Sequence, residues 1–214
     1  MNVSHKLKLI WWAPPRNATR ALSEILCHYD FYNYEINETA DIRSTYHSHN
    51  CKIPTGLEHY DVLLQVRNPY SRIVSCWHLD CFTTVLGEEL IITETFESYI
   101  KSKSKSFINH YENSLNIKFP KYFIRYESLK EDIIKLPFID LNDYNINVAF
   151  ERHIVNNGYM TEGPNNELGN LKRSKHSAYA DWQSYYTQEL ADLVYKEYTD
   201  QFNLFNYDKN SWKV

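Results

Sequence analysis

The hydrophobic pattern of the N-terminal segment predicts a strand followed by a helix. Residues 7–13, LKLIWWA, form a mostly apolar run that stops at two prolines, as expected for a short buried strand. From Thr19 onward, apolar side chains recur every three or four residues, which is typical of a helix with one buried face. These side chains are Ala21, Leu22, Ile25, Leu26 and Tyr29.

The same strand-then-helix pattern occurs a second time. Residues 31–36 predict a further strand, and the polar, irregular residues 37–60 predict a long loop. Residues 61–67, DVLLQVR, are nearly continuously apolar, as in a central parallel strand buried on both faces. Asn68 is a good N-cap residue and Pro69 suits the first helical position, so a helix is expected to begin here.

The C-terminal half predicts one more strand and one more long helix. The expected strand is 121–129, KYFIRYESL. The expected helix is 187–200, with Thr187 as a candidate N-cap. Its apolar face is predicted to contain Leu190, Leu193, Val194 and Tyr198.

These elements favour an α/β domain with a central, mostly parallel sheet flanked by helices. The apolar fraction of 43% is sufficient for a proper core. No repeat, linker or low-complexity tract interrupts the chain, so residues 1–214 are predicted to form a single domain. The tryptophans Trp11, Trp12 and Trp77 fall on strand and helix positions and are expected in the core.

Charge and cysteine content narrow the function classes. A net charge of −4 predicts no nucleic-acid partner, so any anion site must be local. No apolar stretch is long enough to span a membrane, and the N-terminus lacks a secretory pattern, which predicts a soluble, cytoplasmic chain. The four cysteines are expected to be reduced thiols. CWHLDC, residues 76–81, matches no common zinc spacing, so no metal site is predicted.

Cationic and hydroxyl residues follow two of the predicted strands. Ligands of parallel sheets bind at the carboxyl ends of strands, so these residues are expected to form one composite anion site. The sequence disfavours a Walker loop, because the first of the five glycines is Gly56. The alternative is a structural turn whose arginines face water. The residues of the composite site are Arg16, Asn17, Thr19, Arg20, Arg67 and Ser75.

Four segments resemble, in order, those of sulfotransferases that use 3′-phosphoadenylyl sulfate (PAPS). In VRNPYSRIVSCW, Arg67 and Ser75 resemble the pair that holds the 3′-phosphate. APPRNATRAL resembles the 5′-phosphosulfate loop, with Arg16 where the family usually has lysine. YFIRYESLKED and YYTQELADLVYKEYTDQFNLFNYD resemble the third block and the C-terminal helix.

The resemblance implies a P-loop-like three-layer fold, PAPS as co-substrate, 3′-phosphoadenosine 5′-phosphate (PAP) as product, and no metal. Lys172 and Arg173, in GNLKRSKHSAYADW, lie where family members close a basic loop over the nucleotide, although an exposed basic loop is the alternative. The residues implied to hold the phosphosulfate are Arg16, Asn17, Ala18, Thr19 and Arg20.

YHSHNCKIP, residues 46–54, is similar to the His-x-His segment of carbohydrate sulfotransferases of the heparan sulfate 2-O type. This similarity implies that His49 is the general base and that the acceptor is a carbohydrate hydroxyl. His47 is the rival base or orients His49, and Arg16 is implied to stabilise the leaving oxygen. Two incidental histidines in a surface loop are the alternative.

Two other function classes stay open. One is a nucleotide-dependent kinase of related fold, which would need a carboxylate to hold Mg²⁺. The other is a non-catalytic module that binds anions or sulfated glycans through the same basic residues. The identity of the acceptor and the oligomeric state have no signal in the sequence.

Overall fold

The computed structural model describes residues 2–12, 14, 17, 19–33, 53, 55–84, 90–103, 120–151 and 182–213. The chain divides into two compact units, which are described separately. Unit 1 comprises Met1–Val66 and His110–Lys175, and unit 2 comprises Arg67–Asn109 and His176–Val214. The expectation of a single domain over 1–214 stays a prediction.

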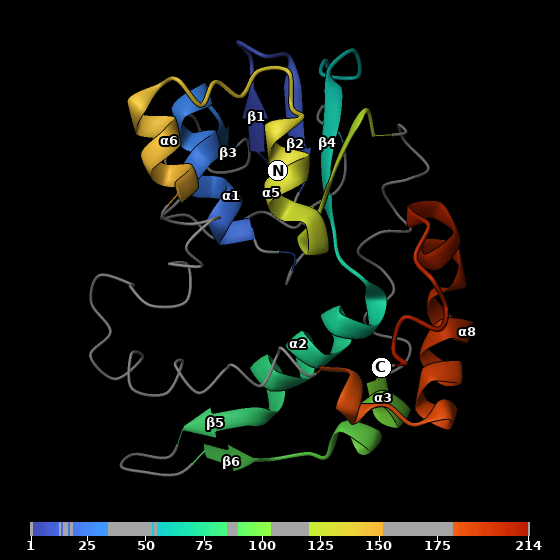
Figure 1. Ribbon diagram of the computed structural model, residues 1–214. Coiled ribbons are helices and arrows are strands. Elements are labelled where there is room, and N and C mark those ends of the chain that lie inside the picture. Colours follow the sequence, from blue (N-terminus) through green and yellow to red (C-terminus); the bar gives the residue numbers. More distant parts are fainter. Residues whose placement is uncertain are drawn as a thin grey trace. The chain divides into compact units, whose positions relative to one another are not determined.

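Unit 1 is built on a five-stranded sheet with the order β3-β1-β2-β4-β7 (Figure 1). β2 pairs in parallel with β4, and β4 in parallel with β7. β1 is antiparallel to both β2 and β3, so every strand except β1 runs in one direction. The α/β class and the mostly parallel sheet are therefore confirmed. The strands are β1 (Asn2–Ser4), β2 (Leu9–Trp12), β3 (Tyr32–Asn33), β4 (Asp61–Val66) and β7 (Tyr122–Arg125).

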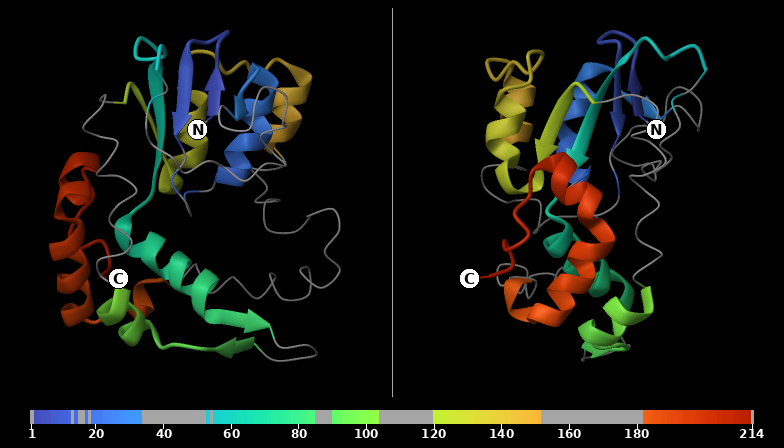
Figure 2. Two further views of the ribbon diagram at one scale, coloured as in Figure 1. Left: turned by 180° about the vertical axis from the view of Figure 1, so that it is seen from behind. Right: turned by 90° about the vertical axis from the view of Figure 1, so that its right-hand side faces the viewer.

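The helices described in unit 1 cover one face of this sheet. Figure 1 shows them in front of the strands, and the view from behind in Figure 2 shows the strands in front. Leu9, Trp11 and Leu63 of the sheet pack against Leu22 and Ile133 of these helices in one buried cluster. The helical elements are α1 (Thr19–Leu26), η1 (Cys27–Tyr29), η2 (Tyr126–Ser128), α5 (Leu129–Ile134) and α6 (Tyr144–Phe150).

The central strand β4 is buried on both faces, as its sequence predicts. Leu63 belongs to the face covered by α1, while Leu64 and Val66 point to the opposite face, and all three are fully buried. Gln65 is fully buried as well, but its side chain is polar, so it needs hydrogen bonds within the protein. The P-loop-like three-layer arrangement stays a prediction.

Two features of unit 1 differ from the sequence expectations. β1 is not anticipated by the pattern, because a three-residue strand is too short to show a period. The strand expected over 121–129 ends at Arg125, and η2 follows. The Asp132 carboxylate accepts hydrogen bonds from the Arg125 backbone N–H and the Ser128 hydroxyl, both at 2.9 Å, and so fixes this turn.

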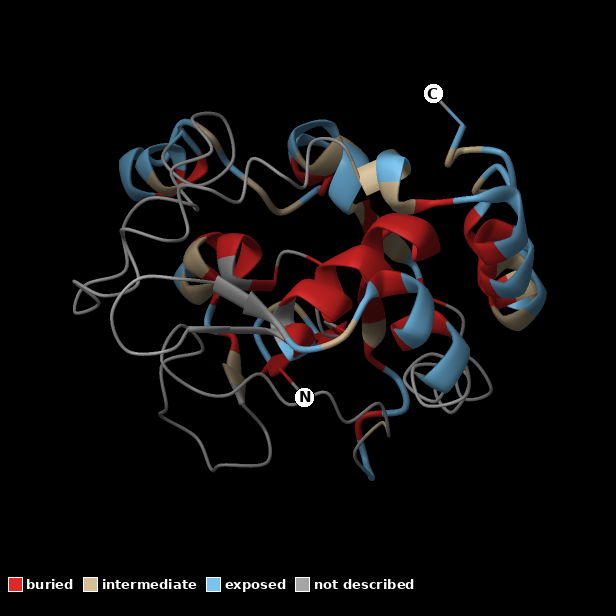
Figure 3. Ribbon diagram, turned by 90° about the horizontal axis from the view of Figure 1, so that it is seen from below, coloured by how far each residue is buried: buried red, intermediate tan, exposed pale blue. Residues whose placement is uncertain are grey.

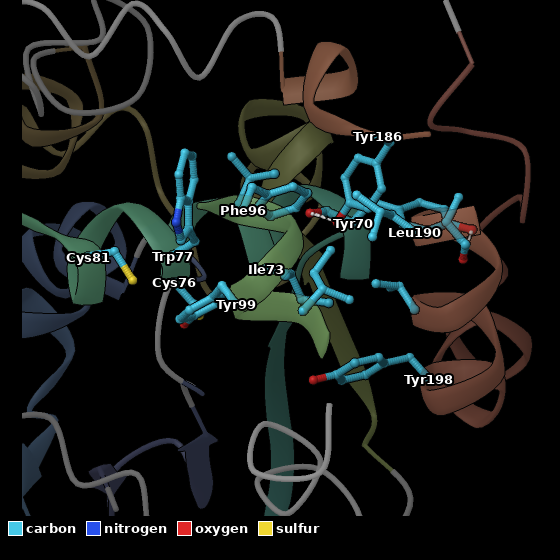
Figure 4. Close-up of a cluster of buried hydrophobic side chains, with 14 of the residues drawn as sticks. Tyr70, Ile73, Cys76, Trp77, Cys81, Phe96, Tyr99, Tyr186, Leu190 and Tyr198 are labelled. Carbon is cyan, nitrogen blue, oxygen red and sulfur yellow. Dashed lines mark hydrogen bonds between the residues drawn. The ribbon is translucent and has the colours of Figure 1, made fainter. Parts of the chain in front are cut away.

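Unit 2 is a helical cluster with a two-stranded antiparallel sheet. Aromatic side chains dominate its core, where Tyr70, Trp77 and Phe96 pack with Tyr99 and Tyr186 (Figure 4). α2 is buried along most of its length (Figure 3). The elements are α2 (Pro69–Cys81), β5 (Phe82–Thr84), β6 (Leu90–Ile92), α3 (Phe96–Lys103) and α8 (Gln188–Phe205).

The C-terminal helix α8 begins as predicted. Thr187 is its N-cap, and the Thr187 hydroxyl accepts a hydrogen bond from the Leu190 backbone N–H at 3.3 Å. Leu190, Val194 and Tyr198 are buried, but Leu193 is 38% exposed, so its assignment to the buried face is wrong. Within the part of the chain that the structure describes, no helix is both long enough and apolar enough to cross a membrane.

The first turn of α2 is held by hydrogen bonds to the C-terminal part of the chain. The Asn68 Oδ1 accepts from the Tyr70 backbone N–H at 3.0 Å, and Asn68 Nδ2 donates to the Ser211 hydroxyl at 2.8 Å. Burial raises the pKa of the Tyr70 phenol, which stays protonated and donates to the Lys209 carbonyl at 2.8 Å. The Tyr186 hydroxyl donates to the Tyr70 carbonyl at 2.9 Å (Figure 4). The predicted N-cap at Asn68 is therefore confirmed.

Replacing Asn68 by alanine is expected to destabilise the protein by about 1–2 kcal/mol, because the cap of α2 and the bond to Ser211 are both lost. Urea unfolding followed by circular dichroism measures this loss. Asn68→Asp is the matched control, because it keeps the cap acceptor and removes only the donor to Ser211, so it should cost less. Equal stability of Asn68→Ala and the wild type would contradict the capping role.

Candidate functional site

The segment that follows β2 is anchored to β4 by a buried side-chain network. The Asn17 Nδ2 donates to the Gln65 carbonyl at 3.0 Å, and the Gln65 Nε2 donates to the Asn17 carbonyl at 2.8 Å. The Trp11 indole Nε1 donates to the Gln65 Oε1 at 3.2 Å. All three residues are fully buried. Asn17 therefore positions the loop with its side-chain amide. Its partner Gln65 lies one residue beyond the last β2–β4 pair, Trp12 with Leu64.

The first turn of α1 contains a buried hydroxyl. Thr19 is the first residue of the helix and is 8% exposed. Its Oγ1 has no hydrogen-bond partner among the residues that the structure describes. The first turn contains no acidic side chain, and its backbone N–H groups and helix dipole favour an anion. Arg20 follows in the same turn of the backbone.

In unit 2, a buried arginine precedes α2. Arg67 directly follows β4 in the chain and is 7% exposed. Its Nε donates to the Ser71 hydroxyl at 2.8 Å, and that hydroxyl donates to the Asn68 carbonyl at 3.3 Å. The guanidinium is thus held by the first turn of α2, with an orientation set through Nε. A positively charged group with a fixed orientation suits recognition of a phosphate.

One side of α2 is polar although it is buried. Ser75, the predicted partner of Arg67 in phosphate binding, is 3% exposed. It lies one helical turn after Ser71, and His78 lies a further turn along the same side. Arg72 is buried as well. The indole of Trp77 and the ring of Tyr185 contact the His78 imidazole, with centroid distances of 4.8 and 5.7 Å.

The structure tests only part of the predicted site. Asn17 and Thr19 belong to unit 1, and Arg67 and Ser75 belong to unit 2, so their union into one composite site stays a prediction. The side chain of Arg20 is not described. The remaining predicted residues lie outside the described residues: Arg16, Ala18, His47, His49, Lys172 and Arg173.

Sequence reasoning missed the residues that hold the predicted ones in place. Gln65 had a usable signal, because it is the only amide in the apolar run DVLLQVR. Ser71 also had a usable signal in the sequence, because residues four apart along a helix lie on the same side and Ser71 is four residues after Arg67. Arg67 itself lies just before the helix begins. Nothing in the sequence indicates that Trp11 is a hydrogen-bond donor, because its apolar neighbours predict only that it lies in the core.

Cysteine and metal chemistry find no support in the described residues. Cys27, Cys76 and Cys81 take part in no disulfide, and Cys51 lies outside the described residues. No cluster of three His, Cys, Asp or Glu side chains suited to a metal ion occurs within the described ranges. The absence of a metal from the reaction stays a prediction.

No family model, curated protein or solved structure matches this chain. The resemblance to sulfotransferases therefore rests on the residues themselves. What the structure adds is local: two neighbouring parallel strands that each lead into a helix, and buried polar groups where both helices begin.

Proposed function

We propose that this protein is a PAPS-dependent sulfotransferase that transfers a sulfuryl group to a carbohydrate hydroxyl. One observation carries the proposal. The neighbouring parallel strands β2 and β4 are each followed by a helix that begins beside a buried polar group, the Thr19 hydroxyl in one case and the Arg67 guanidinium in the other. Hydroxyl, guanidinium and helix N–H groups all donate hydrogen bonds, which suits a ligand with several anionic groups.

The loop after β2 is proposed to hold the 5′-phosphosulfate. The buried Thr19 Oγ1 fits this role, because its O–H has no partner among the described residues and lies at the start of α1. Arg16 and Arg20 would add positive charge, and Ala18 its backbone N–H. The amide of Asn17 is engaged with Gln65, so its contribution would be to position the loop and to offer its own backbone N–H.

The 3′-phosphate is assigned to Arg67 and Ser75. The hydrogen bond from Arg67 Nε to the Ser71 hydroxyl orients the guanidinium before any ligand binds. Preorganised donors bind an anion with less loss of conformational entropy than mobile ones. Lys172 and Arg173 are proposed to contact the nucleotide from the basic segment before the last helix.

The proposed reaction is an in-line transfer. His49 accepts the proton of the acceptor hydroxyl while a bond forms between that oxygen and sulfur. The bond between sulfur and the bridging phosphate oxygen breaks, and PAP leaves with the negative charge. Arg16 and the N–H groups at the start of α1 would stabilise that charge, and His47 would orient His49. Sulfur keeps its oxidation state, so no redox partner is required.

Replacing His49 by alanine is expected to lower kcat by about 10²–10⁴-fold, because the acceptor hydroxyl loses its general base. The Kd for PAP should not change. Transfer from radiolabelled PAPS to desulfated heparan oligosaccharides measures kcat, and calorimetry measures Kd. His47→Ala is the matched control and should lower kcat less.

Three results would contradict this proposal. An unchanged kcat in His49→Ala would show that His49 is not the general base. Tight PAP binding without transfer to any oligosaccharide would favour a non-catalytic anion-binding module. Phosphoryl transfer from Mg²⁺-ATP, with no PAP binding, would favour a kinase.

A further inference from the structure

Two buried polar side chains of unit 1 lack a hydrogen-bond partner within the described residues. Asn2 is 1% exposed, and both its Nδ2 and its Oδ1 are unpaired there. Thr19 is 8% exposed, and its Oγ1 is unpaired in the same sense. Burying such groups without a hydrogen bond costs free energy that an apolar residue would avoid. Side chains that destabilise a fold in this way are often retained because they bind a ligand.

The sheet register places Asn2 at the ligand-binding end of the strands. Asn2 is opposite Trp11 of β2 and Asn33 of β3, near the carboxyl ends of both strands. Residues directly opposite in a sheet share a face, so the Asn2 side chain lies on the face of Trp11, which α1 covers. α1 begins at this same end of the sheet, with Thr19 (Figure 1).

The geometry points to Asn2 as a further ligand-binding residue, one that hydrogen-bonds an oxyanion held at the start of α1. Its Nδ2 carries two N–H donors, and Thr19 adds one O–H. The first-turn N–H groups of α1 add donors of the same kind, with no acidic side chain nearby in that turn. The site thus offers a set of uncharged hydrogen-bond donors, in addition to the positive charge proposed for Arg16 and Arg20. The identity of the anion, the 5′-phosphosulfate of PAPS and the 5′-phosphate of PAP, rests on the proposed function.

A ligand-binding role and a packing role predict opposite effects on stability. If Asn2 serves the ligand, Asn2→Leu raises the melting temperature and weakens anion binding, because the unpaired amide is removed from the core. Thr19→Val, which is nearly isosteric, is expected to behave in the same way. A hydrogen bond to a charged group contributes substantially to the free energy of binding. Each variant should therefore bind the anion roughly 10- to 100-fold more weakly.

Ser4 supplies the matched control. It lies on the same strand and the same face as Asn2 and is also fully buried. Its hydroxyl, however, donates to the Tyr29 carbonyl at 2.8 Å, so its polar group is satisfied by the protein. Ser4→Ala is therefore expected to lower the melting temperature and to leave anion affinity unchanged.

The experiment is a calorimetric titration with PAP, and separately with pyrophosphate and sulfate, combined with thermal unfolding. The wild type, Asn2→Leu, Thr19→Val and Ser4→Ala are compared. Asn2→Asp is added as an isosteric variant whose negative charge should weaken binding further even if Asn2→Leu folds poorly.

The outcomes separate this inference from the proposed function. Weaker binding in Asn2→Leu and Asn2→Asp, with full binding in Ser4→Ala, supports the inference. Binding of pyrophosphate or sulfate that depends on Asn2, without binding of PAP, supports the oxyanion site and overturns the sulfotransferase proposal. Wild-type affinity in both Asn2 variants overturns the inference and leaves the sulfotransferase proposal intact. No binding of any of the three anions overturns both.

Discussion

Arg67→Ala is expected to weaken PAP binding by roughly 30- to 5,000-fold. Truncating one partner of a buried, hydrogen-bonded charge pair costs about 2–5 kcal/mol, and each 1.4 kcal/mol is a tenfold change in Kd. Arg67 is 7% exposed, and its guanidinium is oriented by the bond from Nε to Ser71. Isothermal titration calorimetry with PAP measures the effect.

Two further variants distinguish charge from geometry. Arg67→Lys keeps the positive charge and loses the planar fork, so it should bind with intermediate affinity. Ser71→Ala keeps the arginine and removes the acceptor at 2.8 Å that orients it, so it should weaken binding by less than Arg67→Ala. If PAP binds Arg67→Ala as tightly as the wild type, Arg67 does not hold the 3′-phosphate.

Gln65→Leu is expected to destabilise unit 1 by about 2–6 kcal/mol. Leucine has a similar volume, but it leaves the Trp11 indole N–H and the Asn17 carbonyl buried without their partner. Each such group costs about 1–3 kcal/mol. Because small domains are stable by about 5–15 kcal/mol, this single change should shift the urea midpoint strongly. Chemical unfolding monitored by tryptophan fluorescence measures it.

A double-mutant cycle tests whether the network itself causes the loss. Trp11→Phe removes the indole donor, so the double variant Trp11→Phe/Gln65→Leu should be more stable than the sum of the single effects predicts. Strict additivity would mean that the Trp11–Gln65 bond does not couple the two residues. Gln65 also anchors Asn17, so Gln65→Leu is expected to weaken PAP binding as well.

The strands and helices with a clear period were predictable. The helix that starts at Thr19, the buried strand β4 and the cap at Asn68 each depend on neighbours within a few residues in sequence. Short elements were not predictable in this way. β1 has three residues, and it forms because β2 and β3 offer edges on both sides.

Of the candidate site, the sequence indicated residue types and their order along the chain. It placed a hydroxyl in the first turn of α1 and a cation at the end of β4, because strand and helix boundaries follow from local patterns. It could not assign Asn17 to loop anchoring rather than ligand binding. That distinction depends on Gln65, which is distant in sequence and adjacent only once β2 and β4 pair.

The sequence alone therefore determined the α/β class, the positions of the long elements and the candidate residues Thr19, Arg67 and Ser75. Only the tertiary structure decided which polar side chains are satisfied. Burial and hydrogen bonding are properties of atoms brought together from distant segments, and sequence spacing does not encode them. For this reason Ser4 and Asn2, two residues apart on one strand, look alike in the sequence. In the fold, Ser4 has a partner in Tyr29, and Asn2 has none within the described residues.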